Sequence, residues 1–298
     1  MKIEEILTKF YAGDCFGIDT FGVKTKDEID VSCYPFITKD YSRKNHNGES
    51  WNYYRINPNK YNNINIYNYK DLCFVMDEII SETGLQSAYI TRIDHCLDSF
   101  LDNYDIFLKP NKFILLLLCG KYEIRNRYQS KDLSSQEQLN LVIKNNCIEG
   151  EFYNKALQEP EGVVKSRLEL RTKKLIHHIF FFDSVIQSEF KKWEYRLDNA
   201  SETEYINSAL DRINLELISR FNEEKYDKGF NMNNFLYKYN DCIFVRSQLI
   251  KFYDMLGIKN PKQTASNYIA RHDSKILTLK SVREYIKFIK AKGEMFYS

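Results

Sequence analysis

The 298-residue sequence predicts an α+β fold: a central, mostly antiparallel sheet with flanking helices, followed by a helical C-terminal region. Two observations support this prediction. Before Lys174, short strand-like runs are separated by turns and helical segments, whereas after Lys174 apolar residues recur at helical spacing. We therefore expect a sheet-based unit with trailing helices at 1–228 and a basic helical unit at 229–298.

The expected sheet is built from short runs that either alternate or are wholly apolar. A short amphipathic helix at 2–12 is expected ahead of them, and a helix at 71–83 ends where Gly84 can close it. The run 113–119 is almost entirely apolar but much shorter than the roughly 20 residues that cross a bilayer, so we expect a strand buried on both faces. The predicted strands are 16–24, 53–57, 88–97, 113–119, 148–154 and 165–171.

The remainder of the chain is expected to be helical. Residues 175–228 contain no proline and predict two or three helices. Residues 241–290 predict a compact helical unit, in which a helix at 247–256 is followed by a turn at Gly257 and a second helix at 261–269. This spacing is similar to that of a helix-turn-helix, although any helical hairpin can show it.

Charge is distributed unevenly along the chain. The net charge is only +2, but residues 229–298 hold twelve Lys or Arg against five Asp or Glu, which makes this segment +7 and the first 228 residues −5. Such an asymmetry is expected of a chain that docks a polyanion locally, and the alternative is a solvated helical surface. The candidate duplex-binding residues are Lys259, Lys262, Arg271, Lys275 and Lys280.

Cysteine usage and the N-terminal residues indicate a reducing compartment. The seven cysteines are scattered without a CxxC pair, so neither a zinc site nor a disulfide framework is expected. The first residues lack the basic-then-apolar layout of a signal peptide. We expect a cytoplasmic protein with no membrane association.

Acidic residues alternate along the predicted strand at 88–97 and just beyond it. Side chains alternate faces in a strand, so Asp94, Cys96 and Asp98 should share one surface while Ile93 and Leu97 point away. A small residue between two carboxylates leaves room for a bound group. A divalent cation coordinated by hard oxygens is the obvious candidate. In the first strand, the same alternation predicts Asp19 and Phe21 on one face.

Four short motifs occur in a fixed order over roughly residues 15–185. In chain order they are Asn57-Pro58-Asn59-Lys60 followed by the helix at 71–83, Arg92-Ile93-Asp94 with Asp98, Phe152-Tyr153-Asn154-Lys155, and Arg167-Leu168-Glu169. In this order they resemble the replication initiation factors of rolling-circle plasmids, staphylococcal type, which are related to transposon-borne and filamentous-phage initiators. The absence of a His-hydrophobic-His motif favours this branch over the double-histidine nucleases, since His177 and His178 are adjacent in a predicted helix.

This resemblance implies a nicking-enzyme-like sheet and a catalytic tyrosine. Tyr153 would attack a DNA phosphate, forming a 5′-phosphotyrosyl enzyme and a free 3′-hydroxyl, with Lys155 and Arg167 assisting. Arg92 and Arg171 would contact DNA. The implied ligands of Mg²⁺ or Mn²⁺ are Asp94, Glu169, Asp19 and Asp98. The implied partners are double-stranded and extruded single-stranded origin DNA and a host helicase and polymerase, and a homodimer is one assembly to consider.

Two other functions remain open at this stage. One is a relaxase-like initiator of mobile-element transfer, which uses the same chemistry. The other is a non-catalytic DNA-binding regulator on the same scaffold, against which the intact set of Tyr153, Asp94 and Glu169 argues. A protein–DNA adduct would separate the enzyme from the regulator.

Overall fold

The computed structural model describes residues 15–62, 66–100, 104–120, 141–157, 162, 164–272 and 276–298. The helix predicted at 2–12 and the candidate residue Lys275 lie outside these ranges.

Seven strands form one antiparallel sheet in the order β2-β3-β1-β4-β7-β6-β5, which confirms the predicted α+β class. The strands are β1 (Cys15–Thr25), β2 (Ile37–Lys44), β3 (Ser50–Ile56), β4 (Tyr89–Ser99), β5 (Leu141–Lys144), β6 (Ile148–Asn154) and β7 (Ser166–His178). Five of the six predicted strands correspond to β1, β3, β4, β6 and β7. β2 and β5 were not predicted, because β2 is mostly polar and β5 has only four residues.

Helices flank the sheet and make up the C-terminal region. They are α2 (Tyr69–Thr83), α3 (Tyr104–Cys119), α4 (Phe182–Ser201), α5 (Thr203–Glu224), α6 (Met232–Lys238), α7 (Arg246–Met255), α8 (Pro261–His272) and α9 (Leu279–Tyr297). The predicted helix at 71–83 is confirmed: Asn68 caps its first turn, and Gly84 closes it with a left-handed φ of 70°. The predicted hairpin is confirmed as α7 and α8, with Gly257 in the turn at the same φ.

The run 113–119 is not a strand but the second half of α3. Its residues are buried on every side, so the run lacks the polar face that would reveal a helical period. α3 packs against β6, where Gly150 allows a close approach. A Cβ atom there would lie 2.1 Å from a methyl carbon of Leu115.

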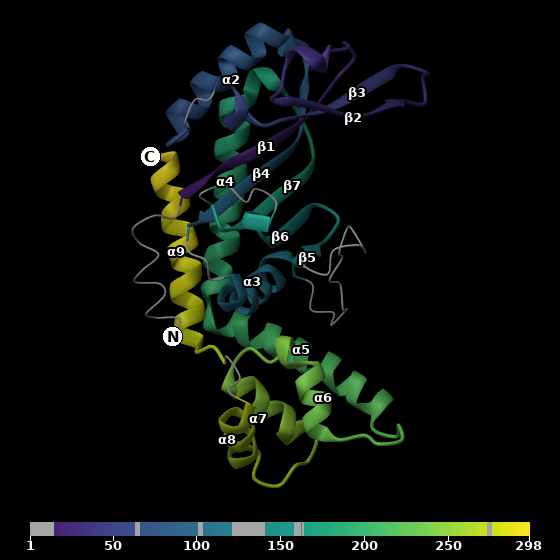
Figure 1. Cartoon of the computed structure of the whole chain (residues 1–298), viewed down its shortest axis with the longest axis vertical. Coiled ribbons are helices and arrows are strands. Elements are labelled where there is room, and N and C mark those ends of the chain that lie inside the picture. The colour runs from purple at the N-terminus through teal and green to yellow at the C-terminus, as the bar shows by residue number, and fades with distance from the viewer. Residues whose placement is uncertain are drawn as a thin grey trace.

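The helices cover one face of the sheet. Leu97, Phe152 and Leu168 pack with α3 and the C-terminal helices, whereas Phe21 and Ile93 pack with α2 and the start of α4. Figure 1 shows α5 to α8 gathered at the end of the molecule remote from α2, while α9 runs back along α4. The sheet therefore has one apolar face under helices and an opposite face that carries polar side chains.

The last helix returns to the strands from the far end of the chain. Phe296 belongs to the core beneath β1 and β4, and the Tyr297 hydroxyl lies 2.9 Å from Nε2 of His95. The division at residue 228 stays a prediction: α9 contacts the sheet and α4, and α6 and α7 also contact α5, so helices of the second unit pack against the first.

The structure also bears on the predicted position of the two adjacent histidines and on membrane association. His177 and His178 end β7 instead of lying in a helix, so the helices of 175–228 begin only with α4. Within the described ranges, no helix has the length and apolar content needed to cross a membrane.

Candidate active site on the charged sheet face

Charged side chains gather on the polar face of the sheet, around β4, β7 and β6. The register places Asp94 opposite Arg171 and Asp98 opposite Arg167, and Tyr153 lies opposite Arg167 on the other side of β7. Residues directly opposite each other in paired strands point to the same face. We call this group the charged cluster; it consists of Asp19, Arg92, Asp94, Asp98, Glu149, Glu151, Tyr153, Arg167, Glu169, Arg171 and Lys173.

The alternation predicted for β4 is confirmed. Asp94 and Asp98 point into the charged cluster with Cys96 between them, whereas Ile93 and Leu97 are buried in the core. Alternation alone therefore located the two faces of the central strand.

The prediction that Asp19 shares a face with Phe21 is wrong, because β1 contains a bulge. The register steps from Ile18 to Thr20 against β4, which leaves Asp19 as the extra residue. A bulge shifts the alternation of the residues that follow it. Asp19 consequently reaches Arg167 on the polar face, while Phe21 is buried against Phe182 on the other.

Arg167 is the central cation of the cluster. Its Nε and Nη2 donate to the two carboxylate oxygens of Asp98 at 2.5 and 2.7 Å, a bidentate pair. Its Nη1 donates to Asp19 and lies 4.0 Å from the Glu169 carboxylate. Burial opposes the charged form of Arg167, but the neighbouring Cys96, Asp98 and Asp19 side chains raise its pKa. Three carboxylates thus converge on one guanidinium.

Arg171 is a second guanidinium that gathers carboxylates further along β7. It donates to Glu169, and its Nη1 and Nη2 lie 2.7 Å from Glu149 and 2.6 Å from Glu151. Glu149 and Glu151 were missed in the sequence, although they alternate with Tyr153 along β6. Because side chains in a strand alternate between its two faces, the positions two and four residues before Tyr153 would have predicted both glutamates on its face.

Asp94 is the most deeply buried carboxyl of the cluster, with 1% of its surface exposed. Arg92 holds it through two hydrogen bonds, one of them 2.7 Å long. Burial raises its pKa to about 6, even though Arg92 and Arg171 favour the charged form. For Asp19 the balance is reversed: burial opposes ionisation, but Arg167, Thr20 and the charge of Lys155 together lower its pKa.

Tyr153 lies at the edge of this charge network. Its hydroxyl donates to Oε1 of Glu169 at 2.6 Å, and only 6% of its surface is exposed. Burial raises the pKa of Tyr153, the Glu169 carboxylate raises it further, and Arg167 opposes the rise. The phenol is therefore protonated at rest and already paired with an acceptor for its proton.

The predicted metal ligands lie close together, but their carboxylates form ion pairs with arginines. Among the described residues, no group of three or more His, Cys, Asp or Glu side chains is arranged to hold a metal ion. Carboxylate oxygens are the donors that Mg²⁺ and Mn²⁺ prefer, yet Arg167 stands where Asp19, Asp98 and Glu169 converge. In this arrangement the carboxylates do not fit a metal ion.

The other predicted site residues lie around or away from the cluster. Lys155 begins the short helix η4 (Lys155–Leu157) directly after β6, and the two arginines expected to contact DNA, Arg92 and Arg171, are paired with carboxylates. The exposed candidates of the C-terminal region are Lys259 in the α7–α8 turn, Lys262 and Arg271 on α8, and Lys280 in the first turn of α9.

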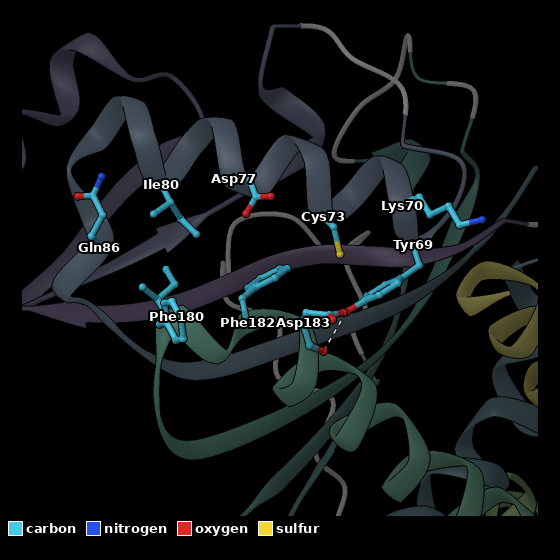
Figure 2. A pocket seen from close by; sticks show the side chains of 10 residues that line it. Tyr69, Lys70, Cys73, Asp77, Ile80, Gln86, Phe180, Phe182 and Asp183 are labelled. Atoms are coloured by element: carbon cyan, nitrogen blue, oxygen red, sulfur yellow. Dashed lines mark hydrogen bonds between the residues drawn. The ribbon is translucent and has the colours of Figure 1, made fainter.

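A pocket of about 640 Å³ lies on the helical side of the sheet, apart from the charged cluster. α2 forms one wall with Cys73 and Asp77, and Phe180 and Phe182 form the other (Figure 2). The Tyr69 hydroxyl closes one end by donating to Asp183. No cluster residue lines this pocket, so it does not belong to the candidate active site.

Comparison with known proteins gives one weak likeness. No family model matches the sequence, and no curated protein matches it. Among solved structures, the chain is similar to a rolling circle replication initiator protein from Geobacillus stearothermophilus, with 12% sequence identity and a TM-score of 0.27. The match covers 54% of this chain and 75% of that chain. The function is therefore inferred from the chain's own residues.

Proposed function

We propose that the chain is a sequence-specific DNA nicking–closing protein that initiates rolling-circle replication by cutting one strand of an origin through Tyr153. The observation that carries this proposal is the 2.6 Å hydrogen bond from the Tyr153 hydroxyl to Glu169 inside a cluster of guanidinium groups. A nucleophile paired with an oriented base is the arrangement that covalent catalysis requires.

In the proposed step the phenolic oxygen of Tyr153 bonds to a DNA phosphorus as its proton passes to Glu169. The bond from phosphorus to the 3′ oxygen of the preceding nucleotide breaks, and that oxygen takes the proton from Glu169 to become a free 3′-hydroxyl. The reverse sequence rejoins the strand, because the energy of the broken bond is kept in the phosphotyrosyl ester. Arg167 lies beside both groups and would stabilise charge on the phosphate in the transition state.

Metal dependence is a separate component of the proposal. The charged cluster holds six carboxylates against the four cations Arg92, Arg167, Arg171 and Lys173, with Lys155 at its border. This excess of negative charge supports a role for Mg²⁺ or Mn²⁺, although Arg167 would have to withdraw for the cation to enter. Cleavage that persists in EDTA would remove the metal from the mechanism and leave Arg167 as the resident cation.

The decisive experiment traps the covalent intermediate. Single-stranded oligonucleotides with a randomised centre and a 3′ label are incubated with the protein and Mg²⁺ or Mn²⁺, and the products are separated on a denaturing gel. We expect labelled DNA attached to the wild-type protein and none attached to Tyr153→Phe. Sequencing the attached DNA gives the cutting site.

The matched control is Tyr285→Phe, which also removes a buried tyrosine hydrogen bond, here one of 2.9 Å to Asn111. This control should form the adduct normally. If DNA is cut without any protein-linked product, the tyrosine mechanism is wrong even though nuclease activity remains.

Origin duplex would be read by α8, the second helix of the α7–α8 hairpin. Ala265 and Tyr268 are buried and fix the helix in place, whereas Lys262 and Arg271 are exposed. The helix contains no acidic residue. Basic residues of this kind contact phosphates and make binding sensitive to salt.

Because α9 packs against the sheet, point substitutions test this proposal better than truncation after residue 228. Lys262→Ala combined with Arg271→Ala should weaken binding to duplex and lower the slope of log affinity against log salt by about 1.8, or about 0.9 for each lost contact. The control is Lys251→Ala on α7, whose ammonium pairs with Asp211 at 2.6 Å. An unchanged salt slope in the double variant would show that α8 is a solvated surface that does not contact DNA.

A host helicase and polymerase would act after the nick. Sedimentation of the purified chain tests whether it forms a homodimer.

A further inference from the structure

A row of aromatic and basic side chains crosses the polar face at the end of the strands remote from Tyr153. Direct register partners link the row from strand to strand: Tyr41 on β2, Tyr53 on β3, Lys24 on β1, Tyr89 on β4 and His178 on β7. Neighbouring strands lie about 4.8 Å apart, so the row spans roughly 19 Å across five strands. We call it the aromatic row.

The rings of the aromatic row are arranged in contact with one another and partly open to solvent. Tyr41 stacks on Tyr53 with ring centres 4.4 Å apart and planes within 19°, and 54% of the Tyr41 surface is exposed. Tyr89 contacts His178 edge to face at 5.3 Å. Trp51, the next residue on this face of β3, lies 5.9 Å from Tyr89 and joins the row. Tyr53, Trp51 and Tyr89 are half-buried.

Positive charge surrounds these rings. Lys24 and Lys26 place their ammonium groups 4.9 and 5.5 Å from the Trp51 ring centre, and exposed Arg43 is the register partner of Trp51. On the ring-bearing face of β2 and β3, Arg43 and Arg55 are basic; Arg55 pairs with Asp40 at 2.6 Å, and Lys26 pairs with Glu49 at the same distance. The surface is therefore aromatic and basic at once.

Next to the aromatic row lie three basic side chains, each paired with a carboxylate: Arg55 with Asp40, and the cluster residues Arg92 and Lys173 with Asp94 and Glu149. Arg55 and Arg92 are both register partners of Gly22, and Arg92 is in turn opposite Lys173. Gly22 is required there, since a Cβ atom would lie 2.8 Å from the Cβ of Arg92. The polar face thus changes along the strands from aromatic side chains to the ion-paired side chains of the charged cluster.

We propose that the aromatic row binds the bases of single-stranded DNA belonging to the strand that Tyr153 cuts; this rests on the proposed function. Single-stranded nucleic acid is bound by grooves that combine basic side chains with rings on which bases stack. A duplex presents no free base faces to such rings, and a sheet surface of this size stacks two or three bases. From Tyr89 to Asp98, β4 covers about 30 Å, so the DNA held by the row is several nucleotides from the cut.

The test measures binding apart from cutting. Fluorescein-labelled (dT)20 is titrated with the full chain carrying Tyr153→Phe, and fluorescence anisotropy is recorded with EDTA present. In this background Tyr41→Ala and Trp51→Ala should each weaken binding about 5- to 100-fold, the range for one lost stacking partner. Tyr41→Phe and Trp51→Phe keep a ring and should restore most of the affinity, which a purely structural role would not explain.

The matched control is Tyr237→Ala on α6, a tyrosine with 74% of its surface exposed and outside the row. It should bind (dT)20 as the parent does. Circular dichroism melting curves confirm that each variant is folded.

Three results would overturn the inference: a parent protein that does not bind (dT)20, folded Ala variants that bind it within twofold of the parent, or tighter binding of (rU)20. These outcomes are distinct from failure of the proposed function. If the chain forms no DNA adduct but the Ala variants lose affinity for (dT)20, the aromatic row binds DNA and the proposed nicking function is wrong. If the chain forms the adduct but all variants bind (dT)20 equally well, the nicking role stands and the aromatic row does not bind the DNA.

Discussion

The two faces of the same sheet solve opposite physical problems. On one face of β4, Ile93, His95 and Leu97 are buried under helices. On the other face, Asp94 and Asp98 are held by arginines from its own strand and from β7. The first face removes apolar surface from water, whereas the second keeps charges out of water only by pairing each of them.

Paired buried charges are poor sources of stability. Desolvation of the two ions offsets most of their attraction, and well-packed apolar residues in the same place are often as stable. Burial of a leucine or phenylalanine contributes roughly 1.5–3 kcal/mol. The apolar face should therefore stabilise the fold, and the charged cluster should serve activity.

Glu169 and Leu170 are neighbours on β7 that point to opposite faces, so they offer the sharpest comparison. Glu169→Gln keeps the size of the side chain but removes the base for the Tyr153 proton. Cutting of the oligonucleotide should fall about 10²- to 10⁴-fold, the usual contribution of a general base. The melting temperature should fall less than in Leu170→Ala, because Arg171 keeps Glu149 and Glu151 as partners. Retention of full cutting activity would exclude Glu169 as the base.

Leu170→Ala should reverse this pattern. Leu170 is buried in the core formed with the helices, and truncation to Ala leaves a cavity that costs about 2–5 kcal/mol of unfolding free energy. Urea denaturation measures this loss. The folded fraction should still form the adduct at the wild-type rate, and a folded but inactive variant would show that the two faces are not separable.

His95 tests the apolar face by pH. Burial lowers its pKa from 6.5 to about 3, so the unfolded chain binds a proton that the folded chain excludes. The contribution of His95 to stability should fall as pH drops from 6.5 toward 3, and at pH 5 its cost is about 2 kcal/mol; comparison with a His95 variant separates it from Asp94, whose raised pKa acts in the opposite direction. The aromatic neighbours of the ring carry no charge that would offset this cost.

His95→Gln removes this titration while leaving an amide to hydrogen-bond Tyr297. Urea unfolding at pH 7.5 and pH 5.0 should therefore differ less for His95→Gln than for the wild type. The control is His177→Gln, an exposed position that should retain the wild-type pH dependence. Equal pH dependence in His95→Gln and the wild type would mean that His95 is accessible to protons in the folded state.

Local periodicity in the sequence was enough to locate much of the candidate site. Alternation placed Asp94 and Asp98 on one face because the side-chain period of a strand is two. The sequence predicted the helix at 71–83, which is α2, and Gly84 predicted its end. These features depend on neighbours along the chain.

The features that were missed depend on contacts between distant segments. The 113–119 run is helical because neighbours bury it on all sides, which no local period reveals. The bulge that turns Asp19 toward Arg167 is set by pairing with β4, and these two residues are 148 positions apart. The aromatic row needs the register of five strands, so it is invisible until the sheet is known.

The contact between His95 and Tyr297 ties the order of synthesis to the assembly of the sheet. A ribosome that has reached Thr278 has already made every residue of the charged cluster, yet α9, which covers the back of β1, does not exist. At 5–20 residues per second, the 202 positions that separate the two partners take roughly 10 to 40 s to translate. During that interval the apolar side of β4 lacks some of its cover, so the nascent chain is a natural client for chaperones.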